Sequence, residues 1–149
     1  MLPEEIEISK NISVNIQAFF NSSDYDFVAV LVDDNRRLHC LPLVQNVIKP
    51  SDIIEIESGE VKKTLDNCVR IWKELTDNHY ERKSLLVNLG GGVIGDMGGF
   101  CAATYKRGID FINIPTTLLS QVDASIGGKL GIDFLGFKNH IGTFELPRK

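Results

Sequence analysis

The sequence predicts an α/β fold in which a mostly parallel sheet is flanked by helices, and three observations support this fold class. Four short apolar runs rich in β-branched residues recur along the chain. Segments with helical spacing of apolar residues lie between them. A run of glycines follows the third apolar run and opens a helical segment. Because alternating strands and helices build parallel sheets with right-handed crossovers, we expect a Rossmann-like arrangement.

The expected strands cover residues 27–32, 53–56, 84–89 and 109–114. We expect an amphipathic helix between the second and third strands, with an apolar face formed by Val61, Leu65, Cys68, Val69, Trp72 and Leu75. Another helix is expected from about residue 96 to residue 106, with Gly108 ending it. The stretch 38–47 is expected to hold a helix that starts near Pro42, because proline suits a first helical turn.

The composition excludes several classes of function. The chain has 149 residues, enough for one domain, and its 43% hydrophobic and 24% charged residues are typical of a soluble globular protein. A formal net charge of -4 without a basic stripe argues against a nucleic-acid partner. The longest apolar run, residues 27–32, is too short to cross a membrane. The acidic segment 1–7 lacks the basic and apolar regions of a secretory signal.

The cysteines and histidines do not suggest a local metal site. Cys40, Cys68 and Cys101 are odd in number and widely spaced, which indicates reduced thiols in a cytoplasmic protein. The histidines are equally scattered along the sequence, at positions 39, 79 and 140. We therefore expect no metal ligands within this chain.

Residues 90–96, Gly-Gly-Gly-Val-Ile-Gly-Asp, form a glycine turn between an expected strand and an expected helix. Their spacing satisfies G-x-G-x-x-G, in which a tight turn brings free amides at a positive helix end close to a pyrophosphate. Glycines at such a turn can also serve a purely structural purpose. Asp110 has the spacing of a ribose-binding acid but begins its strand, so we expect this role from acids at strand carboxyl ends, namely Asp33 or Asp34, and Glu60.

After about residue 124 the chain is punctuated by glycines and shows no clear last element, with Gly127, Gly128, Gly131, Gly136 and Gly142. A compact domain rarely carries a long structureless tail, so this segment is expected to complete its fold against something missing. We expect weak order between Gly127 and His140, because glycines are costly to order without a ligand or a second domain.

Several motifs resemble the 3-dehydroquinate synthase family. They are GGGVIGDMGGF from residue 90, ATYKRG from residue 103, PTTLLSQVDASIGGK from residue 115 and FKN from residue 137. The segment SGEVKK from residue 58 resembles a further motif of the family. The resemblance is dense from about residue 85 to residue 147 and general before residue 58. Its specificity comes from several separate motifs that occur in order at the expected intervals.

The resemblance implies an NAD-dependent synthase of the shikimate pathway, which leads to aromatic amino acids. Its substrate would be the sugar phosphate 3-deoxy-D-arabino-heptulosonate 7-phosphate, and its products 3-dehydroquinate and phosphate. In the family, NAD transiently oxidises a ring hydroxyl, phosphate leaves by β-elimination, NADH returns the hydride, and an aldol step closes the ring. A divalent metal, zinc or cobalt, polarises the hydroxyl that is oxidised.

The same resemblance assigns residues to the cofactor and to the substrate. An acid would approach the adenine ribose, the segment from residue 58 would contact the adenosine end, and the glycine turn would take the pyrophosphate and nicotinamide ribose. The cofactor-binding residues would be Asp34, Ser58, Gly59, Glu60, Val61, Lys62, Lys63, Gly92, Val93, Ile94, Gly95, Asp96, Thr116, Thr117, Lys129 and Lys138. The catalytic and substrate-facing residues would be Lys129, Asp123, Lys138, Asn139 and Arg107. Arg107 would reach a substrate phosphate in its own subunit or in the neighbouring subunit of a homodimer.

Each assigned charge also has a structural alternative. A loop lysine such as Lys129 or Lys138 is usually a solvated surface charge. Asp123 alone would more often cap a helix or turn, and Glu60 would stabilise the next helix through its dipole. The surrounding motifs favour the functional roles, because an anionic sugar phosphate acid needs cationic anchors.

Family members continue into a mainly helical domain that supplies a glutamate and two histidines as metal ligands. We therefore expect residues 1–149 to form the NAD-binding domain alone, lacking that C-terminal helical domain, with the tail from about residue 124 belonging to the substrate-site region. The chain would be a fragment of a longer protein or a product of a split gene. Without the Lewis acid, we expect negligible synthase activity from the isolated chain.

Two alternatives remain open from the sequence. One is a related sugar-phosphate cyclase or a metal-dependent alcohol or glycerol dehydrogenase, which residues 121–129 would distinguish. The other is a non-catalytic nucleotide-binding module. Lys129, Lys138 and Asn139 count against this module, because cofactor sensing alone needs no substrate-facing cations.

Overall fold

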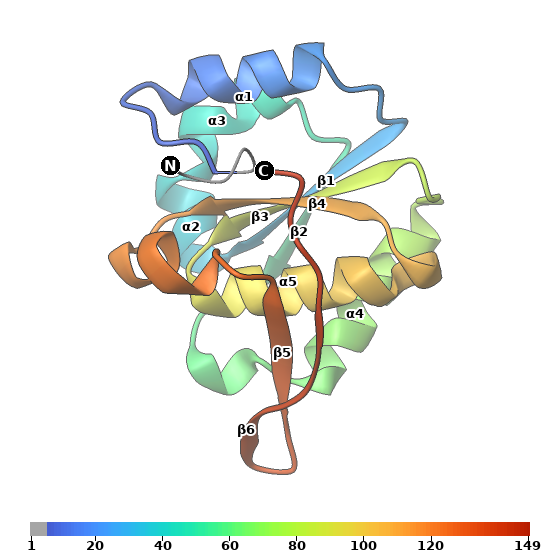
Figure 1. Ribbon diagram of the computed structural model, residues 1–149. Coiled ribbons are helices and arrows are strands. Elements are labelled where there is room, and N and C mark those ends of the chain that lie inside the picture. The colour runs from blue at the N-terminus through green and yellow to red at the C-terminus, as the bar shows by residue number, and fades with distance from the viewer. Residues whose placement is uncertain (1–5) are drawn as a thin grey trace.

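The computed structural model describes residues 6–149 and has a parallel four-stranded sheet at its centre (Figure 1). The strands are β1 (Phe27–Asp33), β2 (Asp52–Ile56), β3 (Ser84–Gly90) and β4 (Asp110–Pro115), in the order β2-β1-β3-β4. All three strand pairs are parallel. The predicted α/β class is therefore confirmed, and each predicted strand lies within one or two residues of the observed one. The central strand β3 is buried along its whole length, as expected for a parallel sheet covered on both faces.

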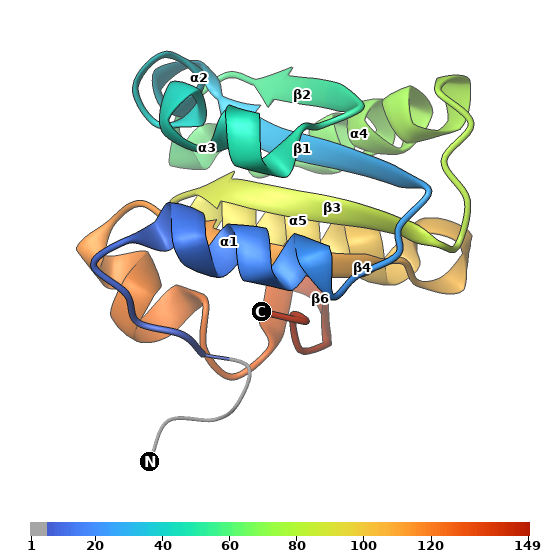
Figure 2. The same cartoon turned by 90° about the horizontal axis from the view of Figure 1, so that it is seen from above.

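Helices cover both faces of the sheet, which gives three layers that Figure 1 shows from the side and Figure 2 from above. On one face, Ile16 of α1 (Ile12–Asn21) and Val44 of α3 (Leu41–Ile48) pack in a cluster with Val30 and Val87 of the strands. On the other face, α4 (Leu65–Asp77) and α5 (Gly92–Thr104) pack in a second cluster that includes Leu31. Neighbouring strand residues thus serve opposite cores, because side chains alternate across a strand.

The amphipathic helix α4 begins later than the sequence predicted. The Thr64 hydroxyl accepts a hydrogen bond from the Asn67 amide at 3.3 Å and so caps α4 at Leu65. Val61 instead lies in a short 3-10 turn, η1 (Glu60–Lys62), and 80% of it is exposed. Half of Val69 is exposed as well, and the helix buries Cys68, Ile71 and Leu75. The predicted apolar face was therefore wrong at Val61 and Val69. The face of α4 that packs in the core is formed by Cys68, Ile71 and Leu75 instead.

Other helix predictions need smaller corrections. Helix α5 starts at Gly92 rather than near residue 96, since the glycine turn itself forms its beginning. It leads into a 3-10 turn, η2 (Tyr105–Arg107), before Gly108. The stretch 38–47 spans two helices, α2 (Asp34–His39) and α3, and proline lies in the first turn of α3 as predicted. Helix α1 was missed.

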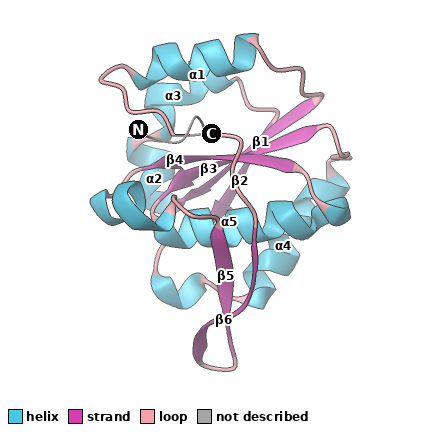
Figure 3. Ribbon diagram, viewed as in Figure 1, coloured by secondary structure: helices cyan, strands magenta, loops and turns pink. Residues whose placement is uncertain are grey.

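The glycine-punctuated tail forms a short helix and a hairpin, so the expectation of no clear last element was wrong. After η3 (Ser120–Ala124), strands β5 (Lys129–Phe134) and β6 (Phe137–Phe144) pair antiparallel and extend away from the main sheet (Figure 3). Leu130 and Ile132 of β5 are buried in the cluster that contains α5. The weak order expected between Gly127 and His140 stays a prediction.

The last residues turn back to the main sheet. The Arg148 amide donates to the Phe111 carbonyl at 2.8 Å, and the Asn113 amide donates to the Lys149 carbonyl at 2.9 Å. The Arg148 guanidinium also lies 3.1 Å from the Asp110 carboxylate. These bonds hold the end of the chain along the free edge of β4.

The remaining sequence predictions concern the cysteines and the termini. The three cysteines are free thiols, and burial, followed by a hydrogen bond with Cys68, raises the pKa of Cys101 well above its usual range. Within residues 6–149, no helix is both long enough and apolar enough to cross a membrane. Most of the acidic segment 1–7, which argued against a secretory signal, lies outside the described residues.

Candidate functional site

The glycine turn joins strand β3 to helix α5 as predicted. Strand β3 ends at Gly90, Gly91 occupies the N-cap position, and α5 begins at Gly92. A Cβ atom on Gly90 would lie 2.6 Å from the Cβ of Ile94, so no larger residue fits this bend. The sequence therefore folds here into a turn that brings backbone, rather than side chains, to the surface.

The turn exposes amides that can bind an anion. The first hydrogen bond of α5 runs from the Gly95 amide to the Gly91 carbonyl at 3.0 Å, so the amides of Gly92, Val93 and Ile94 have no partner inside the helix. Among the described residues, no side chain caps α5 and no acid lies in its first turn. A positive helix end with free amides and no capping carboxylate suits a phosphate group.

These amides border a cleft at the carboxyl ends of β1, β2 and β3. Its lining residues are Asp33, Arg36, Ile56, Glu57, Ser58, Gly59, Gly91, Gly92, Val93, Ile94 and Thr117. The chain runs from β1 outward to β2 and then returns to β3 on the other side of β1, so the cleft lies at the switch point where open α/β sheets bind ligands. Its volume of about 130 Å³ is small for a ligand pocket.

Two neighbouring acids at the end of β1 have different surroundings. Asp33 lines the cleft, and its carboxylate accepts from the Arg36 amide at 2.8 Å. Asp34 accepts from the Ser58 amide at 3.1 Å and so fastens the loop after β2. Hydrogen bonds, first from the Ser58 side chain, lower the pKa of Asp34. Resemblance assigned the ribose contact to Asp34, whereas the structure places Asp33 in the cleft lining.

Arg36 is a cleft residue that the sequence analysis missed. Its guanidinium lies 3.2 Å from the Asp33 carboxylate and donates to the Thr116 hydroxyl at 3.2 Å. It thereby connects the end of β1 to the segment after β4. The sequence could have identified Arg36 by its position three residues after Asp33. Residues three apart in a helical turn lie side by side, so this spacing places the Arg36 side chain next to Asp33. Ile56, Glu57 and Gly91 line the cleft and were also missed.

The two predicted threonines hold the glycine turn from the side of β4. The Thr116 amide donates to the Gly90 carbonyl at 2.9 Å, which extends the pairing of β3 and β4 into the turn. Thr117 lines the cleft, and its hydroxyl lies 2.8 Å from that of Ser120 at the start of η3. The structure thus places both threonines beside the glycine turn and Thr117 in the cleft lining, and their cofactor contacts stay predictions.

The predicted segment 58–63 divides between two hollows. Ser58 and Gly59 line the cleft, while Glu60 and Val61 line a second, wider groove of about 670 Å³ between α4 and the hairpin. Lys138 borders the same groove, with its ammonium 4.0 Å from the Glu60 carboxylate. Lys62 forms an ion pair with Glu57. The two hollows lie on either side of the loop that carries Gly59 and Glu60.

Lys63 and Asp96 meet each other rather than the cleft. Lys63 is only 3% exposed, and its ammonium lies 2.6 Å from the Asp96 carboxylate and 2.5 Å from the side-chain oxygen of Asn139. Burial raises the pKa of Asp96, and the Lys63 ammonium acts in the opposite direction. Lys63 thus forms an internal ion pair, and its contact with adenosine stays a prediction.

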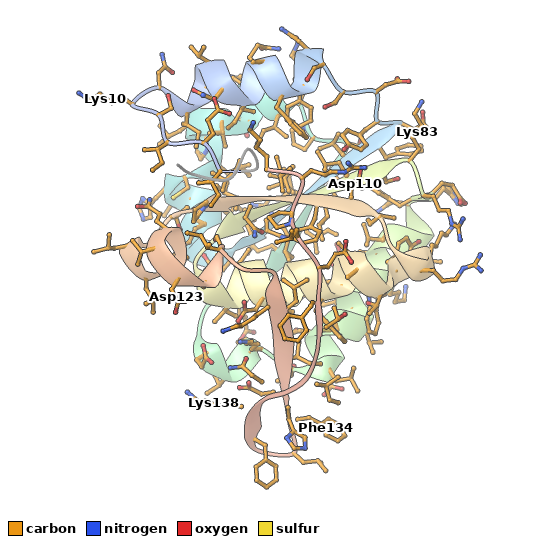
Figure 4. The ribbon with its side chains drawn as sticks, viewed as in Figure 1. Lys10, Lys83, Asp110, Asp123, Phe134 and Lys138 are labelled. Atoms are coloured by element: carbon orange, nitrogen blue, oxygen red, sulfur yellow. The ribbon has the colours of Figure 1, made fainter. Side chains whose placement is uncertain are left out.

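The predicted substrate residues lie on η3 and the hairpin. Asp123 is on η3, whose Ala124 lies 3.4 Å from the position of a Cβ added to Gly92. Figure 4 shows Asp123 and Lys138 toward the same side of the molecule. Lys129 begins β5 and is exposed. The structure thus places Asp123 in the short helix beside the start of α5 and Lys138 in the second groove.

Arg107, a predicted substrate residue, lies far from the glycine turn. It lies in η2 after the C-terminal end of α5, whereas the glycine turn is at the N-terminal end. A helix of 13 residues is about 20 Å long. Arg107 therefore does not reach the same cleft in its own subunit.

The charged residues of the described chain do not build a metal centre. Across residues 6–149, no group of three or more His, Cys, Asp or Glu side chains is close enough to hold a metal ion. The chemistry available from this part of the chain is therefore anion binding by amides and cations, hydrogen bonding by Asp33, and charge pairing near the hairpin.

Two solved structures share this fold. One is a 2-deoxy-scyllo-inosose synthase complexed with carbaglucose-6-phosphate, NAD+ and Co2+, with a TM-score of 0.78 and 23% identity over 90% of this chain and 38% of that chain. The other is a 2-epi-5-epi-valiolone synthase from Streptomyces hygroscopicus with NAD+ and Zn2+ bound, with a TM-score of 0.82 and 23% identity over 99% of this chain and 44% of that chain. At such identities the likeness establishes the fold alone.

Comparison with sequence relatives gives evidence of the family as well as of the fold. The family model described as 3-dehydroquinate synthase N-terminal matches residues 53–149. The 3-dehydroquinate synthase of Parabacteroides distasonis is 44% identical over an alignment of 149 residues, which covers 99% of this chain and 42% of that relative. The chain therefore spans less than half the length of this relative. The matched range includes the glycine turn, the two threonines and the hairpin, and the chain belongs to the 3-dehydroquinate synthase family.

Proposed function

We propose that this chain forms the NAD-binding part of a 3-dehydroquinate synthase, a carbon–oxygen lyase that converts 3-deoxy-D-arabino-heptulosonate 7-phosphate to 3-dehydroquinate and phosphate. The observation that carries the proposal is the uncapped start of α5, which opens three free amides onto a cleft at the switch point of the sheet. Family membership and the NAD+ named in both solved structures support it.

The residues fit a dinucleotide in three respects. The amides of Gly92, Val93 and Ile94 would hold the diphosphate, because they present a positive helix end without a competing acid. Asp33 would accept hydrogen bonds from ribose hydroxyls at the end of β1. Arg36 and Thr117 line the same cleft and would add polar contacts to the dinucleotide. When bound, NAD would supply a hydride acceptor and donor for the transient oxidation.

Cations on the hairpin suit an anionic sugar phosphate. Lys129 and Lys138 would face the substrate with Asp123 and Asn139, and the tail from about residue 124 would form the substrate side of the site. Arg107 would serve the neighbouring subunit of a homodimer, since α5 separates it from its own cleft. The Zn2+ and Co2+ named in the solved structures support a divalent metal in the complete enzyme, held by residues other than those described here. The isolated chain would accordingly have negligible synthase activity.

Calorimetric titration of the 149-residue chain with NAD tests the binding part of this proposal. We expect saturable binding with a dissociation constant of about 1 mM or lower, and about tenfold weaker binding in Gly92→Asp. The new carboxylate would repel the diphosphate, yet an acid in a first helical turn does not destabilise the helix. Gly92 has room for a side chain, because an added Cβ would first meet Ala124 at 3.4 Å.

Gln17→Glu on α1 provides the control, since it makes the same charge change on the opposite face of the sheet. NAD affinity should remain unchanged in this variant. No heat of binding in the unsubstituted chain, or equal affinities in Gly92→Asp and Gln17→Glu, would refute binding at the glycine turn. A turnover assay with the sugar phosphate addresses catalysis separately, and turnover by the isolated chain comparable to that of a full-length synthase would refute the proposed inactivity.

A further inference from the structure

Lys63 lies where three separate segments meet. It follows η1, and its ammonium lies between the carboxylate of Asp96 in α5 and the side-chain oxygen of Asn139 in β6. Two short contacts of 2.6 and 2.5 Å hold the ammonium. Because a buried ammonium is costly without partners, these two oxygens are what allow Lys63 to be almost fully buried.

The backbone of Lys63 binds the other strand of the same hairpin. Its carbonyl accepts a hydrogen bond from the Asp133 amide of β5 at 3.0 Å. The Asp133 carboxylate in turn accepts from the Asn139 amide at 2.9 Å. Both strands of the hairpin are thus attached to a single residue, beside the bend where Asn139 has a positive φ of 49°.

Asp96 connects this junction to the glycine turn, since it directly follows Gly95 in α5. The charged groups that influence its carboxylate are Lys63, Glu60 and Asp123. Burial raises the pKa of Asp96 and the cation lowers it, so the ionised carboxylate and the ammonium depend on each other. If the carboxylate loses its charge, Lys63 retains only neutral acceptors at a buried position, and the free energy favours its release.

We propose that Lys63 is a positioning residue that couples the glycine turn, through Asp96, to the hairpin that carries Lys138 and Asn139. This inference rests on the proposed function, in which the turn holds the dinucleotide and the hairpin faces the substrate. The ammonium does not contact a ligand in this role. It holds the substrate-facing hairpin in place while Asp96 is charged. The glycine turn and the hairpin therefore keep one position relative to each other.

Amide hydrogen exchange of the ligand-free chain tests the coupling. The residue changed is Asp96, and the amides of Asp133 and Asn139 report on the hairpin. We expect Asp96→Asn to increase their exchange by about tenfold or more, because local opening becomes easier once the ammonium is uncompensated. Asp77→Asn is the matched control, since it removes a carboxylate from the exposed ion pair with Lys73 in α4. It should leave hairpin exchange unchanged.

A pH profile separates this coupling from a general structural effect. Opening of the hairpin withdraws Lys63 from Asp96 while α5 stays packed, so the open form has the higher Asp96 pKa, because burial raises this pKa and the Lys63 ammonium lowers it. In the unsubstituted chain, hairpin protection should therefore decrease as the pH falls through the pKa of Asp96. In Asp96→Asn this step should disappear. Lys63→Met should also abolish it and accelerate exchange, and if Lys63→Met does not fold, the comparison of Asp96→Asn with Asp77→Asn decides the matter.

Hairpin exchange within about twofold of the unsubstituted chain in Asp96→Asn, or a pH step that persists in this variant, would overturn the coupling. Neither measurement uses NAD. Failure of NAD to bind would therefore refute the proposed function while leaving the coupling intact, and a hairpin insensitive to Asp96 would refute the coupling while leaving NAD binding intact.

Discussion

Gly95 and Gly98 occupy the same helix, yet alanine should have opposite effects at the two positions. An added Cβ on Gly98 would lie 2.0 Å from the Asn88 side-chain oxygen and 2.8 Å from Leu31, both of which are buried in the sheet. The first atom met from Gly95 is an oxygen of Asn113 at 3.9 Å, which is an ordinary contact. The helix therefore rests on the sheet at Gly98 and has space at Gly95.

The magnitudes follow from two opposing terms. Replacing glycine by alanine inside a helix stabilises it by about 1 kcal/mol. Overpacking a well-filled core costs about 1–3 kcal/mol, and the overlap at Gly98 with two buried side chains places it near the upper end. We expect Gly95→Ala to raise the free energy of unfolding by about 0.5–1 kcal/mol and Gly98→Ala to lower it by about 1–2 kcal/mol.

Urea unfolding followed by circular dichroism measures both variants against the unsubstituted chain. The fluorescence of Trp72 gives a second probe, because its ring packs near Phe100 of α5. Equal free energies of unfolding in the two variants would refute the close approach of α5 to β3. That approach determines where the start of α5 lies relative to the cleft.

Three other substitutions test separate parts of the structure. Ile132→Ala should lower the free energy of unfolding by about 2–5 kcal/mol, because Ile132 is fully buried in the cluster that contains α5, and a change in urea unfolding below about 1 kcal/mol would contradict this docking of the hairpin. Thr64→Ala should cost about 1 kcal/mol by removing the cap of α4, and an unchanged melting temperature would argue against that cap. Burial, and then the hydrogen bond to Asp110, raise the pKa of Tyr25 from 10.0 to about 12. Its neutral form therefore stabilises the fold below pH 10, and this contribution disappears as the pH rises through about 12, so stability should fall less steeply across this range in Tyr25→Phe.

Local sequence determined the strands and the glycine turn. Residues 84–89 were predictable as a buried strand because continuous apolar residues suit a strand covered on both faces. The turn from Gly90 was predictable because its conformation depends on neighbours within a few residues, such as Ile94. The family resemblance rested on the same local motifs.

Helix α1 and the hairpin required the tertiary structure. Among the described residues, no side chain caps α1 and Ile16 is its buried residue, so packing in the cluster with α3 stabilises it more than its own termini do. The hairpin forms where Gly99 allows Leu130 to approach α5; an added Cβ there would lie 2.4 Å from Leu130. That contact joins residues far apart in the sequence.

The tertiary structure also determined which residues lie together at the site. The strand order β2-β1-β3-β4 brings Asp33 and Arg36 to the glycine turn, and α5 separates Arg107 from it. Lys63 had the sequence context of a ligand contact, yet burial beside Asp96 and Asn139 turned it inward. Motifs specify which residue types are present, but strand order and burial decide which of them share a surface, because both arise from non-local packing.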